Sequence, residues 1–318
     1  MIIVTGGAGF IGSNLVKGLN QSGYDNILIV DDLKNGHKSR NMNALEFMDY
    51  MDRWDFIDNL NSFKNDIDVI FHQGACSNTM EYDGQYMLAA NYDYSKELFD
   101  MAAEIFVPFI YASSASVYGT GEKGFKEARP NEDPLNVYAF SKFLFDQYVR
   151  KHQAQVDNQV VGLRYFNVYG QQENHKGKMA SPVYHFYNQL KDEGVAKLFK
   201  GSQNFVRDFI YVDDTIDVNL FFLNNRDVSG IFNCGTGQPR SFVDIAEILI
   251  ELEGSGEWQE IPFPEKLKGK YQDFTEADLS KLRQAGYDKK FTSLEEGIKK
   301  YYNYLTKNDG YLDFSENL

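Results

Sequence analysis

The chain has 318 residues, a formal net charge of −14, and a composition that is 43% hydrophobic and 25% charged. This composition is typical of a globular protein with a large core, and the length predicts about two domains. The acidic balance argues against a nucleic-acid partner, which would require a basic face. No apolar run approaches the roughly 20 residues of a membrane helix.

The cysteines and histidines indicate neither a disulfide framework nor a metal centre. Cys76 and Cys234 form no CxxC pair, and two cysteines cannot build a disulfide scaffold. The five histidines show no HExxH or paired spacing, so we expect no metal site. The first residues, 1–6, predict a strand and a turn rather than a signal peptide. We therefore expect a protein of the reducing cytoplasm.

Short apolar runs alternate with longer helical patterns in the first half of the chain. Strands are expected at 2–4, 26–30, 69–72, 108–113 and 160–165, and helices at 10–20, 87–104 and 138–152. Such alternation is typical of βαβ units and a mostly parallel sheet, and right-handed crossovers place helices on both faces. The sequence predicts a doubly wound α/β domain over residues 1–166.

The pattern changes after residue 166. A polar, glycine-containing segment at 170–179 predicts an active-site loop. The next expected elements are a helix at 181–190, strands at 207–212 and 231–234, and a helix at 242–252 with Ser241 as its cap. We interpret 167–318 as mostly a smaller α/β substrate-binding domain, with segments near 208–234 that return to the first domain.

A glycine-rich turn separates the first expected strand from the first helix. The segment TGGAGFIG matches a dinucleotide-binding pattern through Gly6, Gly9 and Gly12. Glycines let the backbone approach a pyrophosphate, which rests on the helix N-terminus. Asp31 ends the second apolar run, about 20 residues further on, where a ribose-binding carboxylate is expected. The turn predicts a dinucleotide site, with a purely structural turn as the alternative.

The residues leave the identity of the dinucleotide open. Asp31 favours a free 2′-hydroxyl, as in NAD. Lys38 and Arg53 follow in the chain, and either could hold the 2′-phosphate of NADP. Both cations are equally compatible with solvated surface charges.

Tyr138 and Lys142 form a YxxxK pattern that puts both side chains on one face of a helix. An ammonium beside a phenol lowers the pKa of the phenol from ~10 toward the working pH. Tyr138 is then a candidate general base for a hydroxyl proton as hydride leaves carbon. Ser114 ends a strand, where ligands bind in such sheets. YxxxK alone is common by chance, but with the glycine turn it predicts a Ser–Tyr–Lys catalytic group.

These motifs carry a family resemblance that runs through essentially the whole chain. The segments TGGAGFIG, SSASVYG, YAFSK, RYFNVYG and RDFIYVDD resemble the extended short-chain dehydrogenase/reductase family, which includes the nucleotide-sugar epimerases and dehydratases. The resemblance implies a Rossmann domain and a nicotinamide cofactor, NADP with NAD as the alternative. It also implies that Ser114, Tyr138 and Lys142 are catalytic, and that Lys142 holds the nicotinamide ribose.

Two positions narrow the reaction that the resemblance implies. Ala115 and Ser116 stand where the family's dehydratases carry an Asp–Glu pair, so elimination of water is not supported. Ser116 also stands where the epimerase-reductases carry a cysteine. Five further segments, FHQGACS, NYDYSKEL, LNVY, HKGKMAS and IPFPEKLKGKYQ, resemble the branch that inverts C6 of an ADP-heptose. Epimerisation is therefore the expected reaction.

Lys176 matches the second catalytic residue of that branch. A C6 epimerase handles a hydroxyl on either face of its intermediate, so an acid/base opposite Tyr138 makes chemical sense. A lysine out of water or near a cation has a lowered pKa, as a base requires. Spacing alone favours a flexible surface lysine in a polar loop. Lys178 stands where a small polar residue is common, and it could lower the pKa of Lys176 or bind the diphosphate.

The resemblance also implies a set of binding residues. Expected cofactor contacts are Gly6, Gly9, Phe10, Ile11, Gly12, Asp31, Asp32, Lys38, Arg53, Gln73, Gly74, Ala75, Cys76, Ser77, Asn91, Lys142 and Val168. Expected substrate contacts are Asn167, Lys178, His185, Phe199, Lys200, Gly201, Ser202, Arg207 and Tyr271. Arg207 suits a diphosphate because a guanidinium binds oxyanions bidentately.

The sequence thus predicts an NADP-dependent epimerase that acts on an ADP-heptose and, by family resemblance only, forms a homo-oligomer. One alternative is a 4-epimerase of UDP- or GDP-hexoses. A non-catalytic NADP-binding sensor is an alternative of another class, and the YxxxK pattern argues against it.

Overall fold

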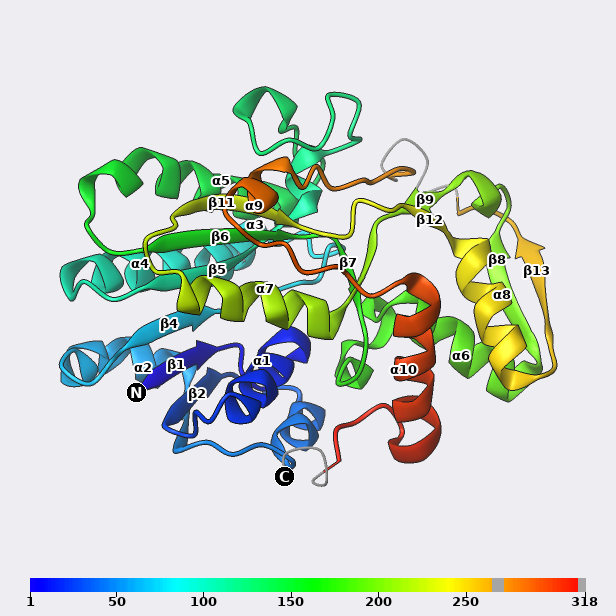
Figure 1. The fold of residues 1–318 in the computed structure, drawn as a ribbon, viewed down its shortest axis with the longest axis horizontal. Coiled ribbons are helices and arrows are strands. Elements are labelled where there is room, and N and C mark those ends of the chain that lie inside the picture. The colour runs from blue at the N-terminus through cyan, green and yellow to red at the C-terminus, as the bar shows by residue number, and fades with distance from the viewer. Residues whose placement is uncertain (265–271, 314–318) are drawn as a thin grey trace.

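Strands and helices alternate through most of the chain in the computed structural model, which describes residues 1–264 and 272–313 (Figure 1). The strands are β1 (Ile2–Thr5), β2 (Ile27–Asp31), β3 (Asp49–Asp52), β4 (Val69–His72), β5 (Phe109–Ser114), β6 (Val160–Tyr165), β7 (Asn167–Tyr169), β8 (Val195–Phe199), β9 (Val206–Arg207), β10 (Phe209–Tyr211), β11 (Gly230–Cys234), β12 (Arg240–Ser241) and β13 (Glu257–Ile261). The helices are α1 (Phe10–Gln21), α2 (Arg53–Asp58), α3 (Gly84–Leu88), α4 (Tyr94–Glu104), α5 (Val137–His152), α6 (Pro182–Glu193), α7 (Val212–Asn224), α8 (Phe242–Glu253), α9 (Ser280–Gln284) and α10 (Leu294–Asn308).

Seven strands form one sheet in the order β11-β6-β5-β4-β1-β2-β3, and every neighbouring pair is parallel. All five strands expected in the first half of the chain belong to it. The doubly wound parallel sheet predicted from the alternation of elements is therefore confirmed.

Side chains of the central strands alternate between two apolar cores, as the period of a β-strand requires. On β1, Ile2 and Val4 join the core that α1 and α7 cover, whereas Ile3 joins the core that α4 and α5 cover. Figure 1 shows α1 and α7 in front of the sheet and α4 and α5 behind it. Because both faces are buried, the central strands read as continuous apolar runs.

A second layered unit, shown at the right of Figure 1, packs helices α6, α8 and α10 beside the two-stranded sheet β8–β13. Leu190, Leu198, Leu249 and Ile298 belong to the core that these elements share. The cap predicted at Ser241 is confirmed. Its hydroxyl accepts a hydrogen bond from the backbone N–H of Asp244, whose carboxylate in turn accepts one from the N–H of Ser241, which is a capping box.

The chain returns to the large sheet after entering the second unit. β11 pairs with β6 over its whole length, and α7 packs against α1. The predicted boundary between residues 166 and 167 separates β6 from β7 in the chain. The division into two domains remains a prediction.

The strand expected at 207–212 is two short strands that separate at Asp208. β9 pairs antiparallel with β12, and β10 pairs parallel with β7. The buried carboxylate of Asp208 accepts hydrogen bonds from the backbone N–H groups of Thr236, Gly237 and Ala277. Its side chain therefore ties three loop positions together where the chain changes partners.

Candidate active site

A cleft of about 1000 Å³ runs along the carboxyl ends of the sheet strands. It lies where β1 and β4 are neighbours without being consecutive, and open α/β sheets bind ligands at such a switch point. The predicted site residues that line the cleft are Gly6, Gly9, Phe10, Ile11, Gly12, Asp31, Asp32, Lys38, Arg53, Gln73, Gly74, Ala75, Cys76, Ser77, Ser114, Tyr138, Lys142, Asn167, Val168, Lys176 and Lys178. Residues predicted for cofactor, chemistry and substrate are thus brought together.

The turn between β1 and α1 leaves no room for side chains. Gly6 has a left-handed φ of +70°, which favours glycine. A Cβ on Gly12 would lie only 2.0 Å from the carbonyl oxygen of Gly6. Gly9, the N-cap of α1, offers no side-chain hydrogen bond to the first turn, so the amide groups of that turn are left for an anionic group. The cradle fits the pyrophosphate of a dinucleotide.

The end of β2 holds a carboxylate with cations around it. Asp31 accepts hydrogen bonds from the backbone N–H of Ala8 at 2.9 Å and from Lys38 Nζ at 2.6 Å. Arg53 Nη2 lies 3.4 Å from the carboxylate of Asp32, and the buried Arg53 Nε has no hydrogen-bond partner. The carboxylate can accept hydrogen bonds from ribose hydroxyls, and the guanidinium can bind a phosphate. This set therefore fits either group.

Asn91 lies behind the cleft and supports its wall. Its side-chain amide exchanges two hydrogen bonds with the backbone of Cys76, at 2.7 and 3.0 Å, and donates a third to Ser141 Oγ at 3.0 Å. Asn91 occupies a π-helical turn, Ala89–Asp93, that divides the helix expected at 87–104 into α3 and α4. Such turns are frequent at functional sites.

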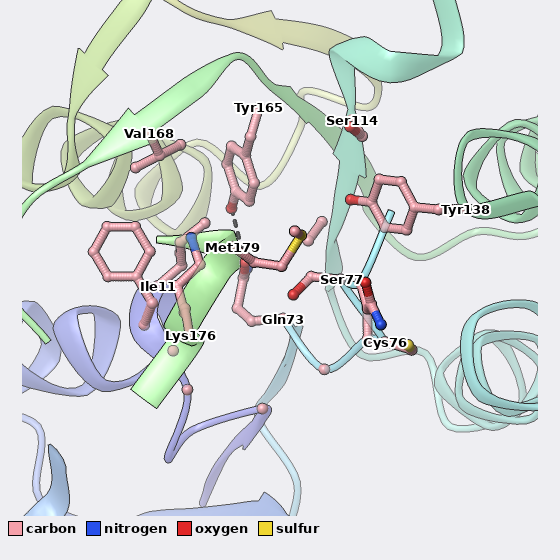
Figure 2. A pocket seen from close by; sticks show the side chains of 18 of the residues that line it. Ile11, Gln73, Cys76, Ser77, Ser114, Tyr138, Tyr165, Val168, Lys176 and Met179 are labelled. Carbon is pink, nitrogen blue, oxygen red and sulfur yellow. Dashed lines mark hydrogen bonds between the residues drawn. The ribbon is translucent and has the colours of Figure 1, made fainter. Parts of the chain in front are cut away.

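The predicted Ser–Tyr–Lys group assembles from β5 and α5. Tyr138 and Ser114 lie on the same side of the cleft in Figure 2. The buried Lys142 is one helical turn beyond Tyr138, and its Nζ donates a hydrogen bond to the carbonyl oxygen of Ala112 at 2.8 Å. Asn136 caps α5 by accepting from the N–H of Ala139 at 2.8 Å, which fixes the start of the helix just before Tyr138.

The protonation of this group differs from the sequence-based expectation. Burial raises the pKa of Tyr138, although a hydrogen bond with Ser114 lowers it. Burial also lowers the pKa of Lys142 to about 8. The nearby charge of Asp146 acts in the opposite direction and raises it. The net direction for Tyr138 is opposite to the predicted lowering, because loss of solvent around the phenol dominates.

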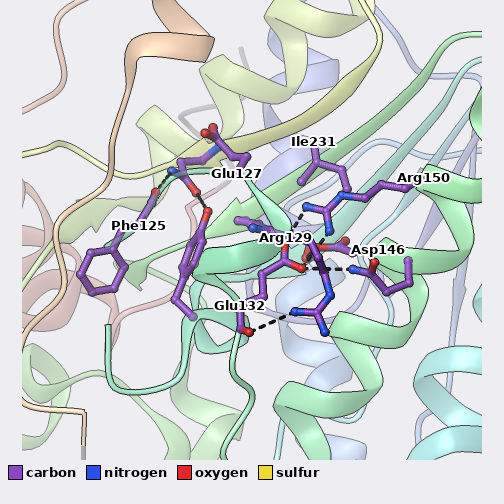
Figure 3. A network of polar contacts seen from close by, with 12 residues as sticks. Phe125, Glu127, Arg129, Glu132, Asp146, Arg150 and Ile231 are labelled. Carbon is purple, nitrogen blue, oxygen red and sulfur yellow. Dashed lines mark hydrogen bonds and ion pairs between the residues drawn. The ribbon is translucent and has the colours of Figure 1, made fainter. Parts of the chain in front are cut away.

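A buried polar network lies behind the catalytic face of α5 (Figure 3). The carboxylate of Asp146 accepts hydrogen bonds from three side chains, those of Tyr111, Ser113 and Arg164. The fully buried Arg164 also pairs with Glu132, which Arg150 contacts at 2.5 Å. Because Ser113 directly precedes Ser114, the network ties the end of β5 to α5.

Lys176 reaches the cleft from the loop predicted at 170–179. Figure 2 shows it on the side of the cleft opposite Tyr138. Its Nζ lies 4.8 Å from the centre of the Phe10 ring and 3.9 Å from a carboxylate oxygen of Glu173. Burial lowers the pKa of Lys176, and the charge of Glu173 opposes this by raising it. The alternative of a flexible surface lysine is wrong, because the side chain is packed in the wall of the cleft.

Several predicted substrate contacts do not line the cleft. His185 lies on α6, and Phe199, Lys200, Gly201, Ser202 and Arg207 lie around the ends of β8 and β9. Phe199 packs against Phe263, and the buried Arg207 lies over the ring of Phe242. Tyr271 lies outside the described residues.

The cleft also includes residues for which no site role was predicted. They are Thr5, Val30, Asn35, Asn78, Thr79, Met80, Ala90, Tyr94, Ala112, Ser113, Ala115, Ser116, Tyr165, Phe166, His175, Met179, Ala180, Ser181, Pro182, Phe209 and Gln272. Most adjoin a predicted residue in the chain, so extending each motif by its neighbours finds them. Phe209 and Gln272 belong to the segments RDFIYVDD and IPFPEKLKGKYQ of the family resemblance, but no site role was predicted for either residue.

Residues 1–264 and 272–313 contain no group of three or more His, Cys, Asp or Glu side chains placed to hold a metal ion. Within the same residues, no helix is both long and apolar enough to cross a membrane.

The fold and the cleft define a class of protein. It is a doubly wound α/β protein whose glycine turn suits a dinucleotide and whose switch-point cleft carries a Ser–Tyr–Lys group at the next strand ends.

Comparisons with known proteins identify the family. The model of the NAD dependent epimerase/dehydratase family matches residues 2–235. The chain is 57% identical over 317 residues to the ADP-L-glycero-D-manno-heptose-6-epimerase of Brachyspira hyodysenteriae, with 98% of this chain and 100% of the relative covered. This protein therefore belongs to the NAD dependent epimerase/dehydratase family, as the motifs predict, and it is an enzyme.

Solved structures agree with this assignment. The Helicobacter pylori ADP-L-glycero-D-manno-heptose-6-epimerase matches with a TM-score of 0.85 and 32% identity, over 96% of each chain. The UDP-glucose 4-epimerase of Thermotoga maritima, solved with UDP-glucose, matches with a TM-score of 0.81 and 29% identity, over 96% of this chain and 98% of that one.

Proposed function

We propose that this enzyme inverts C6 of the heptose in ADP-D-glycero-β-D-manno-heptose, giving ADP-L-glycero-β-D-manno-heptose. The observation that carries the proposal is that Tyr138 and Lys176 line one cleft from opposite sides. An inversion needs an acid/base on each face of the reacting carbon. The names of the relatives at 57% and 32% identity support the ADP-heptose substrate. The 4-epimerases of Thermotoga maritima and Methanobrevibacter ruminantium match at lower identities, 29% and 24%.

The chain's own residues would hold a nicotinamide dinucleotide. The glycine cradle of Gly6, Gly9 and Gly12 would bind its pyrophosphate, and Asp31 would bind a ribose. When bound, the nicotinamide would supply a reversible hydride acceptor for C6. We propose NADP rather than NAD, since Lys38 and Arg53 both line the cleft beside Asp31. Measured affinities test this: Arg53→Met should weaken NADP binding and leave NAD binding unchanged.

Proton transfer would then divide between the two sides of the cleft. Tyr138 or Lys176 takes the proton of the C6 hydroxyl, while Ser114 donates a hydrogen bond to the reacting oxygen. Rotation about C5–C6 presents the other face of the transient C6 ketone. The residue on the opposite side then gives its proton to the oxygen. No net oxidation occurs.

The experiment is to incubate the purified protein with ADP-D-glycero-β-D-manno-heptose and to follow the C6 configuration by NMR, with UDP-galactose in parallel. Inversion of the heptose alone supports the proposal, and inversion of UDP-galactose alone would overturn it. The double variant Tyr138→Phe with Lys176→Met should lose turnover but keep NADP binding. Near-wild-type turnover by that variant would contradict the assigned roles.

We further propose that the enzyme acts in the cytoplasm as a homo-oligomer. The two cysteines are unpaired, as in a reducing compartment, and the oligomer follows from the family resemblance alone. Light scattering on the purified protein measures the oligomeric mass, and a mass of one chain would contradict this part of the proposal.

A further inference from the structure

Glu173 lies at the base of the loop that carries Lys176, and it is fully buried. Its Oε1 accepts a hydrogen bond from Ser181 Oγ and its Oε2 one from the backbone N–H of Ser181, both at 2.6 Å. Ser181 is also the N-cap of α6. One carboxylate therefore closes the loop 173–181 on itself and fastens it to the start of a helix.

The same carboxylate faces the Lys176 ammonium at 3.9 Å. Lys176 is one turn further along the 3₁₀ segment Asn174–Met179, and its side chain is 20% exposed, on the cleft side. The ring of Phe10 covers the ammonium at 4.8 Å. Among the ion pairs of residues 1–264 and 272–313, Lys176 contacts the carboxylate of Glu173.

A buried carboxylate with no stabilising contacts would take up a proton instead of keeping its charge. Glu173 accepts two hydrogen bonds from Ser181, so both of its buried oxygens have partners. Tyr301 of α10 feels that charge as well: burial and then the charge of Glu173 raise the pKa of Tyr301. The contacts with Ser181 thus hold the buried carboxylate of Glu173 beside Lys176.

We propose that Glu173 is a positioning residue for Lys176: it closes the loop, aims the lysine into the cleft and supplies its counter-charge. The inference rests on the proposed acid/base role of Lys176. Such a lysine must both take and give a proton within the reaction, so it needs a pKa near the working pH. Burial lowers the pKa of Lys176, and the charge of Glu173 opposes this lowering without cancelling it.

The other groups that surround this pair do not supply the same charge. Among the described residues, the neighbouring titratable and charged groups include His175 and Lys38, whose charge lowers the pKa of His175, and Tyr301 on α10. None of them is a carboxylate. Replacement of Glu173 therefore leaves the ammonium without its counter-charge.

The test measures the titration of Lys176 directly. Purified full-length protein, saturated with NADP, is acetylated briefly with acetic anhydride over a pH series, and peptide mass spectrometry gives the rate at Lys176. Only the neutral amine reacts. Glu173→Gln should lower the apparent pKa of Lys176 by about one unit, so that labelling below the pKa becomes about tenfold faster. The limb of the kcat/KM–pH profile that Lys176 sets should move by the same amount.

A matched control breaks an exposed lysine–glutamate pair. Glu193 pairs with Lys197 on the surface, four residues apart, so Glu193→Gln should leave the Lys176 titration and turnover unchanged. If circular dichroism shows that Glu173→Gln does not fold, the same labelling experiment is done on Glu173→Asp. It keeps the charge but withdraws it by one methylene, and a smaller shift in the same direction is expected.

An unchanged Lys176 titration in folded Glu173→Gln or Glu173→Asp overturns the inference, whatever the activity. Failure of the proposed function looks different. In that case the wild type does not invert C6, or Lys176→Met retains wild-type turnover, while the labelling still reports whether Glu173 sets the charge of Lys176.

Discussion

At the scale of single residues, burial decides the protonation of the groups around the cleft. Burial lowers the pKa of both Lys142 and Lys176. Each has one nearby carboxylate that opposes the change, Asp146 for Lys142 and Glu173 for Lys176. The two cleft lysines are thus tuned by the same balance from different elements, one from a helix and one from a loop.

His72 provides a prediction about stability and pH. It is buried between Thr5 Oγ1, at 2.6 Å, and Ser95 Oγ, at 2.8 Å. Burial, and then the charge of Lys142, lower its pKa from 6.5 to about 3. The unfolded chain therefore binds the proton first, and the stability that neutral His72 provides is present above pH 6.5 and is lost as the pH falls toward 3.

Between about pH 7.5 and about pH 5.5 the loss from His72 should be about 1.4 kcal/mol. Urea unfolding at both pH values measures it. On acidification, the free energy of unfolding of His72→Asn should fall by about 1.4 kcal/mol less than that of the wild type. His37→Asn changes an exposed histidine and should behave as the wild type. An equal acid-induced loss in His72→Asn and wild type would refute the prediction.

At the scale of elements, apolar strands and local turn motifs were predictable and polar edges were not. β3 is missed because it is only four residues long, begins and ends with Asp, and is partly exposed at the edge of the sheet. α7 starts directly after β10 without a side-chain cap, so its start carries no signal. α10 could have been found, since Ser293 and Glu296 form a capping box.

The start of α1 yields a prediction for one glycine. Gly12→Ala places a Cβ 2.0 Å from the Gly6 carbonyl oxygen, so the turn must shift. We expect NADP binding at least tenfold weaker and a free energy of unfolding lower by about 1–3 kcal/mol. Isothermal titration calorimetry and urea unfolding measure the two effects.

Gly36→Ala is the matched control for Gly12→Ala. A Cβ on Gly36 meets nothing within 4 Å, so binding and stability should stay close to the wild type. Tight NADP binding by Gly12→Ala would show that the cradle tolerates a side chain and would count against its role in binding.

At the scale of the whole molecule, long-range contacts decide what the sequence cannot show. Glu132 and Arg164 are 32 positions apart and pair in the interior, and no local pattern marks either one. The glycine turn and Ser114 adjoin strand ends, and Tyr138 and Lys142 share one helix, so local patterns indicate these parts of the site. Its supporting network, and wall residues such as Phe209 and Gln272, depend on how distant segments pack.

The network predicts a large loss of stability when one charge is removed. Glu132→Gln leaves the fully buried Arg164 with one fewer carboxylate, and breaking a buried pair costs about 3–5 kcal/mol. Asp133→Asn breaks the exposed pair with Lys123, at 3.4 Å, and should cost about 1 kcal/mol or less. Urea unfolding of both variants measures the difference, and equal losses would contradict the argument.

The return of the chain to the large sheet limits how this enzyme could be taken apart or recombined. A fragment that ends at residue 166 would lack β11 and α7, so β6 would become an open edge and the α1 face would lose its cover. Unpaired edges invite aggregation. An exchange of substrate-binding parts between relatives must therefore graft separate stretches on either side of 212–234, and a single crossover point would separate the sheet from its last strand.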